Sequence, residues 1–132
     1  METSLPPPPP SPPLEPQAAS GPSTRTWTVL CHAAALSGIV FHVVGFVAGP
    51  LIVWLMKRGE STEIDAHGKE AVNFQLSMLI WHLIAFLLCF LLVGIPILIG
   101  LFIANIILII IGSLRASEGT LYRYPLTIRF LK

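Results

Sequence analysis

Charged residues are scarce in this sequence, and its two longest apolar stretches contain none. Asp, Glu, Lys and Arg make up only 11% of the 132 residues, whereas soluble domains contain roughly 25%. None of the four occurs between residues 26 and 56 or between residues 71 and 114. Paths for protons or charged substrates through a membrane use ionisable side chains. This absence therefore argues against a carboxylate relay or a charged-substrate pathway in either stretch.

Cysteine is equally scarce, and the motifs of common enzyme classes are missing. Cys31 and Cys89 lie in different apolar stretches, and isolated buried thiols usually act as small hydrophobic groups. The sequence contains no His-Glu-x-x-His, no Gly-x-Ser-x-Gly and no phosphate-binding loop. Its net charge of +1 gives no field that would attract nucleic acid. We therefore predict a protein that is not an enzyme, forms no disulfide, holds no metal or other cofactor, and binds no nucleic acid.

The sequence contains two long runs of uncharged, mostly apolar residues. Residues 26–56 and 71–114 form uncharged runs of about 31 and about 44 residues, and a helix needs about 20 apolar residues to cross the bilayer core. The first run therefore holds one crossing and the second holds two. These lengths predict an all-α integral membrane protein whose membrane domain covers residues 26–132, with three transmembrane helices at about 27–56, 66–93 and 96–118.

Proline dominates the first 25 residues, with five consecutive prolines at positions 6–10. Proline has no amide hydrogen and a fixed φ, so such a run favours the polyproline II conformation and cannot form a packed core. We predict that residues 1–25 are a disordered Pro-rich tail. A ligand for a proline-binding domain is the alternative.

The first apolar run is too long for one straight crossing. A helix over residues 27–56 would measure about 45 Å, against ~30 Å of hydrocarbon. Pro50 disfavours helical geometry at Gly49, so we expect a kink or break near Gly49–Pro50, with a re-entrant pair of short helices as the alternative. Gly38, Gly45 and Gly49 form a small-residue face that lets helices approach closely. We assign this face to packing against the second and third helices, with contact to another copy or another membrane protein as the alternative.

Residues 65–75 join charge directly to the second apolar run, without a turn between them. In a helix, His67, Glu70, Asn73 and Ser77 fall close to one face and form a polar stripe. Asp65 is expected to cap the N-terminus of this helix, because its carboxylate can accept hydrogen bonds from the first-turn amides.

Glu70 lies near the predicted membrane boundary and needs a positively charged partner from another part of the chain. Its neighbour Lys69 points away from it, since adjacent helical residues do not face each other. We hypothesise that Glu70 anchors either the loop at residues 57–58 or the C-terminal tail through Arg123 or Arg129. A solvated turn beside the membrane is the alternative.

Neutral polar side chains occur inside both apolar runs. They can satisfy one another through hydrogen bonds between helices, worth about 1 kcal/mol each. His82 and Asn105 lie near the midpoints of their predicted helices and are candidates for such a contact, while a metal or haem held by histidines is the alternative. The His, Asn and Gln residues among these neutral polar side chains are His32, His42, Asn73, Gln75, His82 and Asn105.

The last residues, 120–132, alternate apolar and polar side chains with the period of extended chain. We predict an extended interfacial tail in which Tyr122, Arg123, Tyr124 and Arg129 lie among the lipid headgroups. With three crossings, the tail and the 57–70 loop share one side, which then holds seven of the eight basic residues. The positive-inside rule predicts a cytoplasmic C-terminus and an external N-terminus.

Three motifs in order resemble a family of small bacterial membrane proteins of unknown function. They are Gly49-Pro50-Leu51, Asp65-x-His67-Gly68-Lys69-Glu70-Ala71-x-Asn73-Phe74-Gln75 and Tyr122-Arg123-Tyr124-Pro125. That family is grouped with the twenty-kilodalton subunit of the chloroplast inner-envelope import translocon (Tic). The resemblance covers about residues 27–132. It implies a compact helical domain in the bacterial inner membrane, no assigned enzymatic activity, and a weaker link to protein translocation.

Taken together, these features predict a scaffold or subunit of a membrane assembly in contact with the lipid bilayer. The alternative is a transport or translocation component. The candidate structural or interaction residues are Asp65, His67, Gly68, Lys69, Glu70, Asn73, Gln75, His82, Asn105, Arg123, Tyr124 and Pro125.

Overall fold

Helices account for almost all of the chain between residues 22 and 117, as the predicted all-α fold class requires. A computed structural model describes residues 22–132, so most of the predicted Pro-rich tail lies outside the described residues. Residues 118–132 form neither helix nor strand. The elements in order are α1 Pro22–Ala33, η1 Ala34–Ser37, α2 Gly38–Lys57, α3 Thr62–Leu88, η2 Cys89–Leu91 and α4 Gly94–Ser117.

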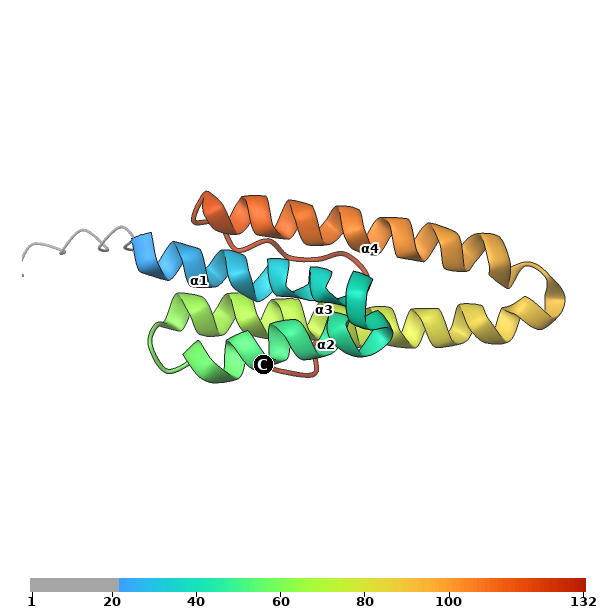
Figure 1. The fold of residues 1–132 in the computed structure, drawn as a ribbon, viewed down its shortest axis with the longest axis horizontal. Coiled ribbons are helices and arrows are strands. Elements are labelled where there is room, and N and C mark those ends of the chain that lie inside the picture. The colour runs from blue at the N-terminus through green and yellow to red at the C-terminus, as the bar shows by residue number, and fades with distance from the viewer. Residues whose placement is uncertain (1–21) are drawn as a thin grey trace, which may run out of the picture.

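Three helical segments are long and apolar enough to cross a membrane, which confirms the predicted number by length and composition. They are Ser23–Lys57, Thr62–Leu91 and Gly94–Ser117. The second and third form a long antiparallel pair, α3 and α4, that extends well beyond the other helices (Figure 1). The turn between them is short because Leu92 adopts a left-handed conformation at φ 61°.

The first apolar segment is folded back on itself, and its break lies at Phe41–His42 rather than at the predicted Gly49–Pro50. His42 has φ 55° and ψ −150°, which interrupts the helix, while Pro50 lies inside α2. The Lys57 ammonium stands 4.3 Å from the centre of the Trp27 ring, although a straight helix would separate these residues by about 45 Å. α2 therefore runs back in the direction opposite to α1 (Figure 1) and its end contacts α1 at Trp27, as in the re-entrant alternative.

Small residues explain why the chain reverses so tightly. Ser37 donates from Oγ to the Gly45 carbonyl over 2.8 Å, and a Cβ on Gly45 would stand 2.6 Å from the Ser37 carbonyl oxygen. Gly49 touches the backbone of Ala34 so closely that a Cβ there would collide with it. The small-residue face thus packs within the chain. Its Gly45 and Gly49 positions meet the other arm of the hairpin, not the second and third helices.

The second helix starts four residues earlier than predicted, and its cap is Ser61 instead of Asp65. Ser61 has extended backbone angles, and its Oγ accepts a hydrogen bond from the Glu63 amide at 3.1 Å, the usual geometry of an N-cap serine. Asp65 instead accepts from Trp54 Nε1 at 2.9 Å and pairs with Lys69 Nζ at 2.6 Å. It therefore ties α3 to the end of α2.

The buried core lies where η1, α3, α4 and the C-terminal segment after α4 meet. Its central members are Phe74 and Met78 from α3, Ile109 from α4, Ala35 from η1, and Tyr124 from the tail. Tyr124 is only 4% exposed, so the prediction that it lies among lipid headgroups is wrong. Its ring stacks on Phe74 with centroids 4.0 Å apart and an interplanar angle of 9°. The tail is therefore part of the core.

Candidate functional site

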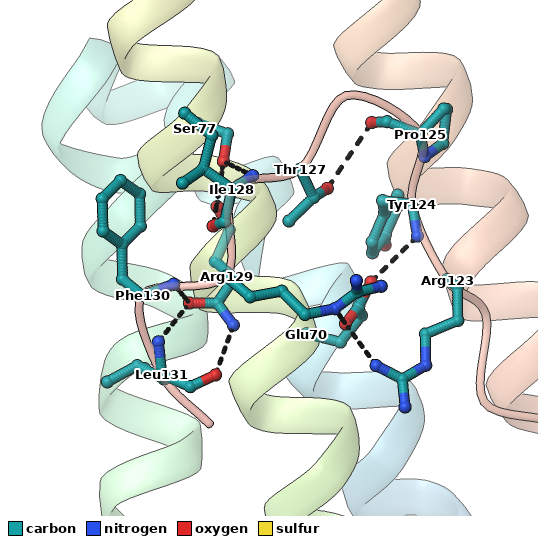
Figure 2. Close-up of polar contacts among 11 residues, drawn as sticks. Glu70, Ser77, Arg123, Tyr124, Pro125, Thr127, Ile128, Arg129, Phe130 and Leu131 are labelled. Atoms are coloured by element: carbon teal, nitrogen blue, oxygen red, sulfur yellow. Dashed lines mark hydrogen bonds and ion pairs between the residues drawn. The ribbon is translucent and has the colours of Figure 1, made fainter.

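The C-terminal tail, residues 118–132, runs along the bundle, turns, and comes back beside α3 (Figures 1 and 2). Its turning point is Leu126, which has φ 59°. On α3 the side chains that hold the tail are Glu70, Asn73, Ser77 and Trp81, at spacings of three, four and four residues. Such spacing places them on one face of a helix, and this face is the polar stripe expected from the sequence.

Glu70 is the charged end of this stripe. Its side chain is 3% exposed, and its Oε1 accepts from the Tyr124 amide at 2.9 Å. Its Oε2 lies 3.5 Å from Arg123 Nη1 and 3.7 Å from Arg129 Nε. Figure 2 shows both arginines converging on this carboxylate from the two arms of the tail. Of the two partners hypothesised from the sequence, the structure pairs Glu70 with the tail and not with the 57–58 loop.

Asn73 binds the last part of the tail in the way that a neighbouring strand would. Its Oδ1 accepts from the amides of Phe130 and Leu131 at 3.0 and 2.8 Å. Its Nδ2 donates to the Leu131 carbonyl at 2.8 Å. The backbone N–H and C=O groups of an extended segment without a partner strand need hydrogen-bond partners from another part of the protein. Here the Asn73 side chain provides them for two consecutive residues.

Ser77 and Trp81 continue the same arrangement further along α3. Ser77 Oγ accepts from the Ile128 amide at 2.7 Å and donates to the Asn73 carbonyl of its own helix at 2.8 Å. Trp81 donates from Nε1 to the Leu126 carbonyl at 3.2 Å. The stripe thereby reaches the turning point of the tail.

A second set of polar contacts links the tail to α1 through the buried core. The Tyr124 hydroxyl lies 2.8 Å from His32 Nδ1, and His32 Nε2 lies 3.0 Å from His67 Nδ1. Burial raises the pKa of Tyr124 well above its usual range, and the Glu70 carboxylate and Tyr122 add to this, so the phenol stays neutral. A neutral imidazole donates from one nitrogen and accepts at the other. The three side chains thus form one directional hydrogen-bonded chain.

A cavity of 380 Å³ opens further along the bundle, between α2, α3 and α4. Gln75 Nε2 donates to Asn105 Oδ1 at 3.1 Å, and Asn105 Nδ2 donates back to Gln75 Oε1 at 3.4 Å. The candidate hydrogen bond between Asn105 and His82 is not formed: Asn105 pairs with Gln75, and His82 Nδ1 hydrogen-bonds the Met78 carbonyl of its own helix at 2.7 Å. All three side chains nevertheless line this cavity, together with His42.

A smaller cavity of 230 Å³ lies at the surface between α3 and the tail. Two acidic and four basic side chains line it. Both acidic groups are already paired, since Asp65 binds Lys69 and Glu70 faces the two arginines. The charged lining residues are Asp65, Lys69, Glu70, Arg123, Arg129 and Lys132.

Two further candidates, Gly68 and Pro125, have structural roles in helix packing and in the turn of the tail. Gly68 lies under the Trp54 ring, and a Cβ on it would collide with the indole. Pro125 precedes the turn at Leu126, and its carbonyl accepts from Thr127 Oγ1 at 3.5 Å. Neither residue touches the cavity between α2, α3 and α4.

Four residues whose polar side chains hold the tail or link it to α1 were not among the predicted candidates. Ser77 was expected in the polar stripe and Arg129 as a partner of Glu70. Trp81 and His32 had no assigned partner. Trp81 could have been found, because it extends the stripe by one more step of four residues. His32 was noticed as a polar residue, but nothing local to it predicts a bond to a tyrosine 92 positions away. Within residues 22–132, no group of three or more His, Cys, Asp or Glu side chains is placed to hold a metal ion.

Comparison with known proteins gives one match. A family model described as the magnetosome magnetite crystal formation protein family covers residues 23–131. No curated protein and no solved structure matches the chain, and the match gives no support to the suggested link with the chloroplast import subunit. The match spans the helices, the polar stripe and the tail, and the chain therefore belongs to the magnetosome magnetite crystal formation protein family.

Proposed function

We propose that this protein is a non-enzymatic scaffold or subunit of a membrane assembly. The proposal rests on the observation that the buried polar side chains of the protein bind other parts of the same chain. Glu70, Asn73 and Ser77 bind the protein's own tail, and His32 and His67 bind Tyr124 and each other. Glu70 and Asn73 also line the small surface cavity, but the hydrogen bonds of all these groups are made within the chain, where they maintain the fold.

The outer surface supports the same role. Side chains of α4, of the distal half of α3 and of η2 are exposed and apolar, including Leu83, Phe90, Ile99, Ile103 and Ile107. In a bilayer such a surface contacts lipid or other apolar helices. The family description supports an assembly in the magnetosome membrane, where magnetite crystals form.

We further propose that both ends of the described chain face the same side of the membrane. The hairpin of α1 and α2 brings Trp27 to Lys57, and the Arg25 guanidinium lies 3.6 Å from where a Cβ on Gly119 would be. If α3 and α4 cross the membrane, all eight basic residues of the sequence then fall on one side. The positive-inside rule makes this side cytoplasmic and replaces the external N-terminus expected from three crossings.

Accessibility of engineered cysteines tests this topology. In cells whose inner membrane is intact, single cysteines placed at Ser23 and at Lys132 should both resist an impermeant thiol reagent, in a background where Cys31 and Cys89 are replaced by alanine. A cysteine at Val93, in the α3–α4 turn, is the positive control and should react. Reaction at position 23 together with protection at position 132 would show a crossing by the first segment.

Crosslinking in native membranes, followed by identification of the crosslinked proteins, tests the scaffold role. A photoreactive residue at exposed Ile103 should capture specific membrane proteins or further copies of this chain. The same residue at Ala116, which is fully buried, is the matched control and should capture none. Failure of several exposed positions to capture any protein, with a solubilised protein that is a lone monomer, would contradict the proposal.

The cavity between α2, α3 and α4 supports a second candidate, a transport component, because polar groups line it within the apolar part of the bundle. Vesicles containing the purified protein should then release a trapped small solute faster than protein-free vesicles. Equal release rates across solutes of different size and polarity would rule this candidate out.

A further inference from the structure

The cavity between α2, α3 and α4 contains polar groups whose hydrogen-bonding capacity the protein does not fully use. Each amide of the Gln75–Asn105 pair has two N–H donors, and each spends one on its partner. No other described residue accepts the second N–H of either amide. Both side chains are 2% exposed, and an unpaired donor in an apolar environment is costly.

His82 adds an acceptor to these donors. A carbonyl oxygen can only accept, so His82 must donate from Nδ1 to Met78. In the neutral imidazole the other nitrogen, Nε2, is then an acceptor, and it lies at the end of the ring farther from the backbone. The cavity therefore offers donors from α3 and α4 and an acceptor from α3.

The backbone is strained at one of the residues that line this cavity. His42 has φ 55° and ψ −150°, a region that glycine occupies and other residues rarely adopt. Its side chain lines the cavity, so the strain falls on a residue that faces this space. Strained residues of this kind gather at ligand sites and switches.

The cavity also lies deep in the membrane-spanning part of the bundle. His82 follows Glu70 by 12 residues, which corresponds to about 18 Å along a helix. The volume of 380 Å³ falls within the ~300–1,000 Å³ of typical ligand pockets. Apart from the four polar residues, the lining is apolar and includes Val43, Phe46 and Phe102.

We propose that this cavity binds a neutral, lipid-soluble molecule whose head is a hydroxyl group. A hydroxyl can accept from the free amide N–H groups and donate to His82 Nε2, so it matches both kinds of group. A ketone or ester would leave the His82 acceptor unused. A carboxylate would be an uncompensated charge at this depth. The apolar lining holds the hydrocarbon part of the ligand, and this site is independent of the scaffold role.

Photolabelling of the full chain in phosphatidylcholine vesicles tests the proposal. The probe is hexadecanol carrying a diazirine and an alkyne, and the matched control probe is the corresponding hexadecane without the hydroxyl. We expect the alcohol to label the cavity residues at positions 38–47 and 75–82, and excess unlabelled hexadecanol to suppress this labelling. The hexadecane should label the exposed lipid-facing surface without such a preference.

Variants separate specific binding from partition into lipid. Gln75→Leu with Asn105→Leu removes the amide pair at similar side-chain size, and labelling of the cavity should fall by about tenfold, as expected for the loss of one or two hydrogen bonds. Leu83→Phe, at an exposed position on the same helix, is the control and should label like the unchanged protein. Should the double variant fail to fold, His82→Phe provides the same test. Equal cavity labelling by both probes, or full labelling in a folded variant, would overturn the proposal.

Discussion

Replacing Asn73 with alanine should release the end of the tail while leaving the helices folded. The amide of Asn73 accepts from Phe130 and Leu131 and donates to the Leu131 carbonyl. Alanine keeps the helix, since it has the best helix propensity. All three contacts are nevertheless lost, and no other described side chain hydrogen-bonds the amides of Phe130 and Leu131.

The size of the effect follows from those contacts. Each hydrogen bond contributes about 0.5–1.5 kcal/mol net, so three contribute roughly 2–4 kcal/mol to the free energy that holds residues 130–131 in place. The tail remains fixed upstream, because Ser77 still binds Ile128 and Glu70 still binds Tyr124. We therefore expect local opening and not global unfolding.

Amide hydrogen exchange in lipid nanodiscs measures this opening residue by residue. In the Asn73→Ala protein, the amides of Phe130 and Leu131 should exchange about 30-fold or more faster, since 1.4 kcal/mol corresponds to tenfold. The Tyr124 amide is the internal control and should change little. Ser113→Ala, which removes a hydroxyl bonded only within α4, is the control variant. Unchanged exchange at Phe130 and Leu131 would refute the idea that Asn73 holds the tail.

Three other changes test separate parts of the structure. Glu70→Arg should reduce the yield of folded protein, because it puts a like charge beside two arginines. Adding Arg129→Glu should restore part of that yield. A full yield of folded protein from the single variant would contradict the pairing. Tyr124→Phe leaves His32 Nδ1 without its partner and should lower the unfolding free energy by about 1–3 kcal/mol, measured by denaturant unfolding in detergent. The raised pKa of Tyr124 means that the folded state favours the neutral phenol. The contribution of this phenol to the unfolding free energy is therefore complete below the ordinary tyrosine pKa and is lost as the pH rises further. Above about pH 10 the unchanged protein should lose stability more steeply than the Phe variant. Gly49→Ala should push α1 and α2 apart and destabilise the fold by about 1–3 kcal/mol; a spin-label distance between positions 27 and 57 that stays unchanged would show that the hairpin tolerates the added carbon.

The sequence was informative wherever a property depends on neighbours along the helix. The length of the uncharged runs was enough to predict the three apolar segments. The spacing of three or four residues was enough to predict the stripe from Glu70 to Ser77. The segments and the stripe are local or near-local properties, and the structure agrees with them. For Glu70 the sequence left two partners, the 57–58 loop and the tail, with a solvated turn as the alternative, and the structure selects the tail.

Properties set by distant contacts were missed for a physical reason. Pro50 is the strongest local signal for a break, yet α2 accommodates it, and the chain reverses at His42, where no residue type announces a turn. The reversal is fixed by the approach of Gly45 to Ser37, which a helical pattern does not reveal. The burial of Tyr124 likewise depends on Phe74 and His32, which lie in other elements.

The two amide side chains of α3 show how one helix separates two roles. Asn73 and Gln75 are two residues apart, so they point about 200° away from each other around the helix axis. Asn73 faces the tail, and Gln75 faces Asn105 and the cavity. A change at one should therefore leave the other intact: Asn73→Ala should loosen the tail without altering labelling of the cavity, and Gln75→Leu should do the reverse. Loss of both properties in either variant would mean that the tail and the cavity form a single unit, so that movement of the tail would control access to the cavity.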